Sequence, residues 1–137
     1  MSSYELNANN IGKALPEEVL SFLHERYDSV EVPTEAISFE DMTHIEQMMG
    51  WIANENTFLN YIYNVADISC RNSKLLGLKE KHEMDVIKKN VIKSYKDNLE
   101  SINKLLSRKI TLYQMNKENE RMENRVYNSQ RGDADAV

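Results

Sequence analysis

The sequence predicts an all-α protein: an elongated antiparallel helical hairpin, or coiled-coil-like bundle, with a short N-terminal helix and polar arms. The chain of 137 residues contains only four Gly and two Pro, which is too few for the many turns of a β fold. Charged residues make up 28% of the chain and Asn occurs fifteen times, so apolar residues have to form narrow stripes. Apolar residues recur at helical spacing over two long segments, which provides such stripes.

Four segments follow from this pattern: a flexible polar arm at 1–14, a short helix with an extended connector at 15–33, a long helical hairpin at 34–128, and a polar tail at 129–137. The short helix begins at Pro16, where a missing backbone N–H costs nothing. Acidic residues directly after Pro16 suit the positive end of the helix dipole. The apolar face of this helix comprises Val19, Leu20, Leu23 and Tyr27.

The second helix is expected to begin at Ser38, with Asp41 completing a variant of the capping box. Apolar and small residues then alternate gaps of three and four, which is a heptad-like seam. Its members are Met42, Ile45, Met49, Ile52, Asn56, Leu59, Tyr63, Ala66, Cys70 and Ser73. Trp51 flanks the seam, and we predict that it packs on the short helix through Leu20 or Leu23.

Gly77 followed by Leu78 predicts the end of this helix, because Gly readily adopts the left-handed conformation after a helix. If Gly77 is a turn, two long helices fold back on each other as a hairpin. If it is tolerated inside a helix, they form one rod. The hairpin is the favoured alternative.

The third helix is expected from about residue 80 to residue 127, and it carries two apolar lines. The first consists of Ile92, Tyr95, Leu99, Ile102 and Leu106. The second is thinner and displaced by one residue around the helix, and it consists of Leu105, Leu112, Met115, Asn119, Met122 and Val126. The candidate assembly contact consists of this line from Leu112 onward together with Ile110. Because an isolated helix of this length is marginal in water, we predict that the second line is an intermolecular assembly contact. Asn56 lies in the seam of the second helix and Asn119 in the second line of the third helix. Each is a candidate for fixing the register in which its own seam packs.

Charge divides the chain into an acidic half and a basic half. Residues 1–70 hold twelve acids and two bases, giving −10, and residues 71–137 hold ten acids and fifteen bases, giving +5. The basic residues that could contact an anion or a nucleic acid are Lys88, Lys89, Lys93 and Lys96, with Tyr95 as an aromatic that could stack on a base. The alternative is a solvated helix face that pairs with the acidic half of the same or another chain.

The sequence offers little for catalysis, so we expect a protein that is not an enzyme and has no catalytic residues, metal site or cofactor. His24, His44 and His82 lie on different segments, and Asp41 with His44 is only half of a carboxylate-histidine metal motif. Cys70 would need a neighbouring His to be a nucleophile, and its place in the seam favours a buried apolar role. No glycine-rich phosphate loop is present.

The function that we expect is non-catalytic helical assembly or adaptor work, by self-association or with larger protein partners, as in a phage structural, scaffolding or accessory protein. The alternative is a small DNA-handling accessory protein, such as a recombination mediator or replication adaptor, that uses the basic segment. The sequence shows no secretory signal and no run of 18 apolar residues. We therefore expect no membrane contact and a location in the cytoplasm, meaning the host cytoplasm or the virion if the protein is phage-encoded.

Overall fold

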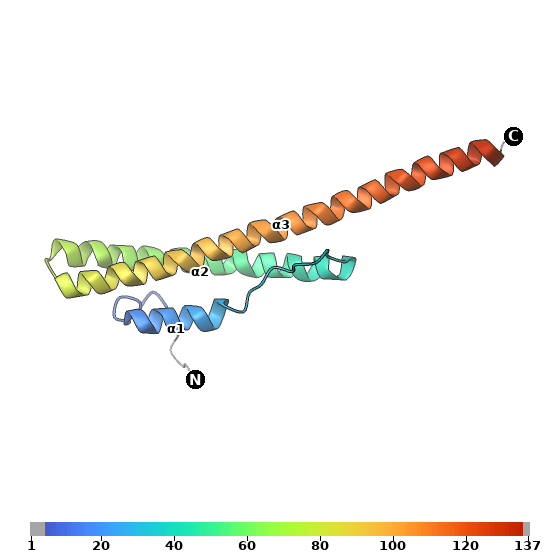
Figure 1. Cartoon of the computed structure of the whole chain (residues 1–137). Helices are drawn as coiled ribbons and strands as arrows, with labels where there is room; N and C mark the ends of the chain where they lie inside the picture. Colours follow the sequence, from blue (N-terminus) through green and yellow to red (C-terminus); the bar gives the residue numbers. More distant parts are fainter. Residues whose placement is uncertain (1–4, 136–137) are drawn as a thin grey trace.

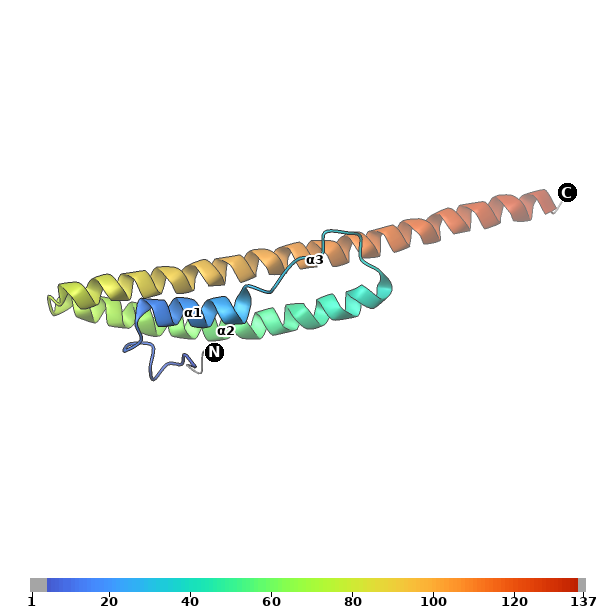
Figure 2. The same ribbon diagram turned by 60° about the horizontal axis from the view of Figure 1, so that its bottom comes forward.

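The computed structural model describes residues 5–135, with side chains over residues 5–127, and contains three helices: α1 (Pro16–Tyr27), α2 (Phe39–Leu75) and α3 (Lys79–Asp135). α2 and α3 run antiparallel, and α1 lies alongside this pair (Figures 1 and 2). None of residues 5–135 forms a β-strand. The predicted all-α fold with a long helical hairpin is confirmed.

The two predicted helix starts are found where the sequence places them. Pro16 is the first residue of α1, and the Leu15 backbone N–H donates to Glu18 Oε1 at 3.0 Å. Ser38 caps α2: its Oγ accepts from the Asp41 backbone N–H at 3.2 Å, and its own N–H donates to Asp41 Oδ2 at 2.9 Å. These reciprocal bonds satisfy amide groups that the first turn of a helix leaves without partners.

Gly77 is a turn, so the hairpin alternative is correct. Its φ of 69° lies in the left-handed region, where a residue with a Cβ is strained. The Gly77 N–H donates to the Lys74 carbonyl at 3.1 Å and the Leu78 N–H to the Ser73 carbonyl at 2.9 Å. This pair of bonds is the Schellman motif, which ends α2 and reverses the chain.

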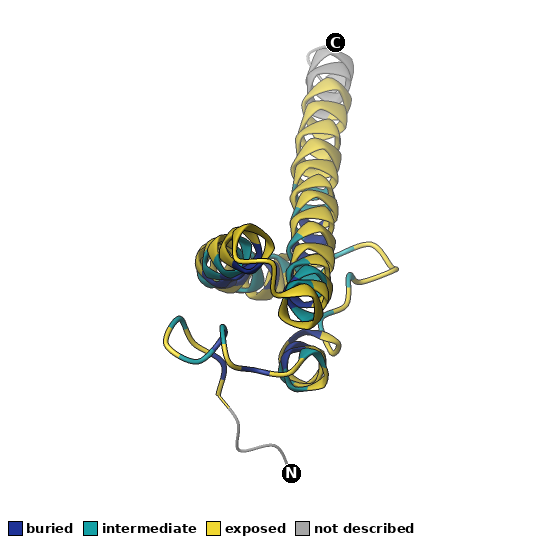
Figure 3. Cartoon of the chain, turned by 90° about the vertical axis from the view of Figure 1, so that its left-hand side faces the viewer, coloured by how far each residue is buried: buried dark blue, intermediate teal, exposed yellow. Residues whose placement is uncertain are grey.

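The core lies between α2 and α3 and continues under α1, as the end-on view in Figure 3 shows. All ten residues of the α2 seam are buried or half-buried. On α3, four residues of the first apolar line are buried and Tyr95 is half-buried. Met49, a member of the α2 seam, is half-buried at the edge of the core.

α1 docks against both long helices. Tyr27 is buried, and its ring lies 5.9 Å from the Trp51 ring and 6.1 Å from the Tyr95 ring, measured between centroids. Trp51 therefore meets α1 as predicted, although the ring contact is made by Tyr27. Leu20 does not belong to the buried face, because 49% of it is exposed.

A buried carboxylate on α2 joins α1 to α2 through hydrogen bonds. Glu55, which is 5% exposed, accepts a hydrogen bond from the Tyr27 hydroxyl at 2.9 Å and another from Arg26 Nε at 3.1 Å. Burial raises the pKa of Tyr27, and the bond to Glu55 raises it further. A buried carboxylate needs such partners to offset its loss of hydration.

Residues 5–14 differ from the predicted flexible polar arm, since they pack against the hairpin. Leu6, Ile11 and Ala14 are at most 3% exposed and belong to the core. Asn7 and Asn10 fold this stretch into turns: the Asn10 N–H donates to Asn7 Oδ1 at 3.1 Å, and the Ile11 N–H to the Asn7 carbonyl at 3.0 Å. Its three apolar residues are too few and too unevenly spaced to indicate such packing from the sequence.

The far end of α3 extends beyond the rest of the molecule (Figure 1). Every side chain described after Tyr113 is exposed, and the helix continues to Asp135 through most of the segment predicted as a polar tail at 129–137. Among the helices of residues 5–135, none has an apolar stretch long enough to cross a membrane.

Candidate functional site

The most prominent surface feature is an apolar line along the distal part of α3, which we call the distal line: Leu112, Met115, Met122 and Val126, with Asn119 between them. The four apolar side chains are between 54% and 58% exposed, and Asn119 is also exposed. Ile110, which the sequence grouped with them, is half-buried and packs against the core instead. Exposed apolar residues are ordinary when single, but a continuous row is typical of an interaction surface.

The distal line faces away from the hairpin core. At roughly 100° of rotation per residue, Met115, Met122 and Val126 lie about 160° to 200° around α3 from the buried Leu106. α2 lies on the Leu106 side and could not cover these residues even if it were longer. The displacement around the helix is therefore close to half a turn, and the two apolar lines occupy opposite faces.

The face of α3 that continues from Leu106 becomes polar beyond the point where α2 begins. Ile110 and Tyr113 are its last half-buried residues, and Lys117 and Asn124 follow on the same face. The core face thus loses its apolar character just as the opposite face gains it. α3 therefore carries two separate apolar lines. The proximal line packs against its own chain, and the distal line has no packing partner in residues 5–127.

A groove borders the distal line where α2 begins. It has a volume of about 540 Å³ and lies between residues 36–39 and one side of α3 from Lys109 to Glu120. Lys109 is one of the lining residues, and its Nζ donates to the Glu35 carbonyl at 3.0 Å. Phe39, at 68% exposure, and Leu112 give it apolar walls.

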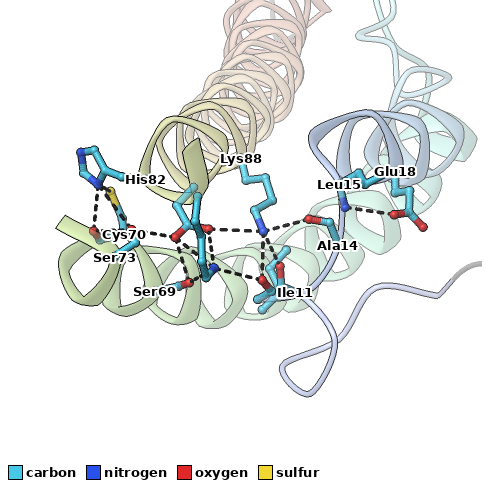
Figure 4. Close-up of polar contacts among 12 residues, drawn as sticks. Ile11, Ala14, Leu15, Glu18, Ser69, Cys70, Ser73, His82 and Lys88 are labelled. Carbon is cyan, nitrogen blue, oxygen red and sulfur yellow. Dashed lines mark hydrogen bonds and ion pairs between the residues drawn. The ribbon is translucent and has the colours of Figure 1, made fainter. Parts of the chain in front are cut away.

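The structure removes Lys88 from the predicted anion-binding surface. Lys88 is 2% exposed, and its Nζ donates to the carbonyl oxygens of Ile11 and Ala14, each at 2.9 Å (Figure 4). Burial lowers the pKa of Lys88, and the Asp85 carboxylate opposes this change. This ammonium group holds the N-terminal segment on α3 and cannot reach an external phosphate, so its assignment as an anion contact is wrong.

The Asp85 carboxylate is the centre of the polar cluster near the hairpin turn. It is 1% exposed and accepts from Ser73 Oγ at 3.0 Å, Ser69 Oγ at 3.1 Å and Lys81 Nζ at 3.2 Å. Burial alone would raise the pKa of Asp85, but these hydrogen bonds outweigh burial and the pKa lies below its usual value. Asp85 is therefore an ionised group that joins α2, α3 and, through Lys88, the N-terminal segment.

The other residues of the predicted nucleic-acid contact all have partners within the chain. Lys89 Nζ lies 2.7 Å from Asp67 Oδ1, and Lys93 Nζ lies 3.1 Å from Asp97 Oδ2. Lys96 Nζ lies 4.8 Å from the centre of the Tyr63 ring. The Tyr95 hydroxyl donates to Asp28 Oδ1 at 2.9 Å, and burial together with this bond raises its pKa to about 12.

Cys70 has a histidine neighbour that the sequence did not indicate. His82 Nδ1 lies 3.7 Å from Cys70 Sγ, 3.4 Å from Ser73 Oγ and 3.0 Å from the Cys70 carbonyl oxygen (Figure 4). A carbonyl oxygen can only accept a hydrogen bond, so Nδ1 carries a hydrogen and is not a free base for the thiol. The arrangement fits a buried thiol that fills space beside a capped turn.

The histidines and the carboxylate that the sequence offered as possible metal ligands lie apart. Asp41 and His44 are both exposed at the start of α2, and His24 pairs with Asp28 on α1. Within the part of the chain that the structure describes, no group of three or more His, Cys, Asp or Glu side chains could hold a metal ion.

Leucines at the hairpin turn form a second exposed apolar patch. Leu75 is 85% exposed and Leu76 is 70% exposed, while Leu78 is 47% exposed beside them. The sequence indicated Leu78 only as part of the helix stop. Leu75 lies about 200° around α2 from the buried Ser73, at roughly 100° per residue, so it faces away from the core.

Comparisons with known proteins give no further information on function. No protein-family model, no curated protein and no solved structure matches this chain.

Proposed function

We propose that this chain is a non-catalytic helical assembly or adaptor protein that acts through the distal line of α3. The observation that carries the proposal is the position of that line: a heptad-spaced apolar row, more than half exposed, on the face of α3 opposite the core. A helix with this row exposed gains stability only by packing it against another helix. The folded stem formed by α1, α2 and the proximal part of α3 would serve as a rigid base for the projecting end.

A phage structural, scaffolding or accessory role stays a prediction. The alternative function, nucleic-acid handling through the basic segment, has less support. Lys88 is buried, and Lys89 and Lys93 are already paired with carboxylates of this chain. Nucleic-acid binding would have to break those pairs before it gained phosphate contacts.

Sedimentation equilibrium over a wide range of protein concentrations tests the assembly proposal. The wild-type mass should exceed that of one protomer and rise with concentration. A variant with Met115→Glu and Met122→Glu should have the mass of one protomer, because a packed seam would bury both carboxylates.

A control variant with Ile68→Glu and Ile87→Glu adds the same charge at side chains that are 56% and 50% exposed elsewhere on the hairpin. It should assemble like the wild type. A wild type with the mass of one protomer at every concentration, or an assembled Met115→Glu, Met122→Glu variant, would contradict the proposal. A labelled single-stranded DNA that binds with a steep salt dependence would favour the alternative.

A further inference from the structure

The charges that flank the distal line select the direction of a partner helix. We assign heptad position a to Leu112, Asn119 and Val126, and position d to Met115 and Met122. This assignment defines two rows of residues that flank the distal line. Position e holds Lys109, Asn116 and Glu123, and position g holds Lys104, Thr111, Glu118 and Arg125. Side chains in these rows lie beside the partner helix in any two-stranded packing.

A parallel, in-register pair of these helices would bring like charges together. In that arrangement each g residue faces the e residue five positions later on the partner. Glu118 would face Glu123, and Lys104 would face Lys109, and each of these contacts would occur twice because of the twofold symmetry. Like charges at such sites lower affinity and exclude wrong arrangements.

An antiparallel pair removes this conflict. In antiparallel packing g residues face g residues and e residues face e residues, with position a of one helix opposite position d of the other. When Asn119 lies opposite Met122 of a second copy, Met115 lies opposite Val126, and Glu118 faces Arg125 twice. Asn116 faces Glu123 twice, so no like-charge pair is present among the side chains described.

We propose that the distal line binds a second copy of this chain in antiparallel orientation, with Glu118 of each copy paired with Arg125 of the other. This inference rests on the proposed function, because it names the partner of the same surface. The twofold axis then passes between residues 120 and 121. The two Asn119 side chains lie about 4.5 Å apart along the axis at 1.5 Å per residue, so their amides can hydrogen-bond to each other.

The orientation places the two hairpin turns at opposite ends of the assembly. Residue 76 lies about 65 Å from the twofold axis along α3, so the two turns are about 130 Å apart. A parallel pair would place them side by side. Energy transfer between dyes on Leu76→Cys, in a Cys70→Ser background, separates these cases: the antiparallel pair gives no transfer, and efficient transfer overturns the proposal.

Charge substitutions give a second, independent test. Glu118→Arg should raise the dimer Kd about tenfold or more, since two attractive pairs become repulsive. Adding Arg125→Glu to the same chain should restore the wild-type Kd. In a parallel pair Glu118→Arg would lower the Kd by relieving the contact with Glu123, and either a lower or an unchanged Kd overturns the proposal.

Glu120→Arg is the matched control. Glu118 pairs with Arg121 and Glu120 pairs with Lys117 within α3, so each substitution loses one exposed ion pair. Glu120 lies away from the seam, so its substitution should leave the Kd within about twofold of the wild type. A wild type that stays one protomer at all concentrations refutes both proposals, whereas a dimer with efficient energy transfer refutes the orientation alone.

Discussion

The proximal and distal parts of α3 each carry an apolar line with helical spacing, yet the two lines lie in different environments. Leu99 and Leu106 on the proximal line are fully buried against the rest of the chain, whereas Met115 and Met122 on the distal line are more than half exposed. Spacing alone does not distinguish them. Their positions around the helix do, because the proximal line faces α2 and the distal line faces away from it.

Lysines on α3 show a similar contrast. Lys88 is buried and donates to backbone carbonyls of the N-terminal segment, whereas Lys93, on the same helix, is exposed and pairs with Asp97. A row of lysines in a sequence therefore does not define one surface. Substitutions of Lys88 and of Lys93 should therefore change the free energy of unfolding by very different amounts.

The largest effect is expected for Lys88→Met, which should lower the free energy of unfolding by about 3 to 5 kcal/mol. The substitution leaves Asp85 as a buried charge with fewer partners and leaves the carbonyls of Ile11 and Ala14 without their ammonium donor. Lys93→Met is the control and should cost at most about 1 kcal/mol. Urea denaturation of both variants measures the difference, and equal losses would show that Lys88 contributes no more than a surface lysine.

A second contrast compares the two apolar lines directly. Leu99→Ala should cost about 2 to 5 kcal/mol because it leaves a cavity in the hairpin core. Met122→Ala should change the stability of the single chain by no more than about 0.5 kcal/mol. Thermal or urea denaturation at a concentration where the chain is one protomer provides the measurement. A large loss for Met122→Ala would mean that the distal line packs within its own chain.

The third prediction concerns pH and the Asp85 carboxylate. The folded-state pKa of Asp85 lies below its unfolded value of about 3.9. Ionised Asp85 therefore contributes stability above that unfolded value, and the contribution is lost as pH falls through the folded-state pKa. The stability of Asp85→Asn should fall less than that of the wild type between about pH 6 and pH 2.

Urea denaturation at several pH values measures this slope, and Asp97→Asn, at an exposed site, is the control. The groups around Asp85 from both long helices are Ser69, Ser73, Lys81 and Lys88. Equal slopes for Asp85→Asn and the wild type would show that Asp85 has no lowered pKa.

The smallest effect on stability is expected from removing residues 114–137. This deletion keeps Tyr113 and the half-buried Ile110, so the free energy of unfolding of the stem should change by no more than about 0.5 kcal/mol. It removes most of the distal line, so the chain should have the mass of one protomer in sedimentation. A shortened chain that assembles like the wild type would place the assembly surface on the stem, for instance at the leucines of the turn.

Local signals in the sequence predicted much of the fold. Pro16, the Ser38 and Asp41 pair, and Gly77 with Leu78 each act through bonds to neighbouring residues, so they locate the helix starts and the turn without knowledge of the rest of the chain. The α2 seam was also predictable, because its period of 3.5 residues fixes one face of the helix. The exposed row on distal α3 was visible as a pattern for the same reason.

Contacts between residues distant in sequence could not be predicted in this way. The sequence did not indicate that Lys88 would meet the carbonyls of Ile11 and Ala14, because backbone acceptors 74 and 77 positions away leave no pattern in side-chain types. It also did not place His82 beside Cys70. Both contacts depend on how the N-terminal segment and the two long helices align after the Gly77 turn.

The sequence by itself determined the helix class, the starts of α1 and α2 and the presence of two apolar lines on α3, because these depend on neighbours within about two turns. It favoured a reversal at Gly77 but did not decide between a turn and a continuous helix. The sequence predicted the second line as a contact surface, but only the tertiary structure showed that the first line is core, that the second is exposed, and which lysine is buried. The reason is the direction from which α2 approaches α3: it covers the Leu99 and Leu106 face and leaves the Met115 and Met122 face open. The packing of all three helices together sets that direction, so it cannot be predicted from the sequence of any single segment.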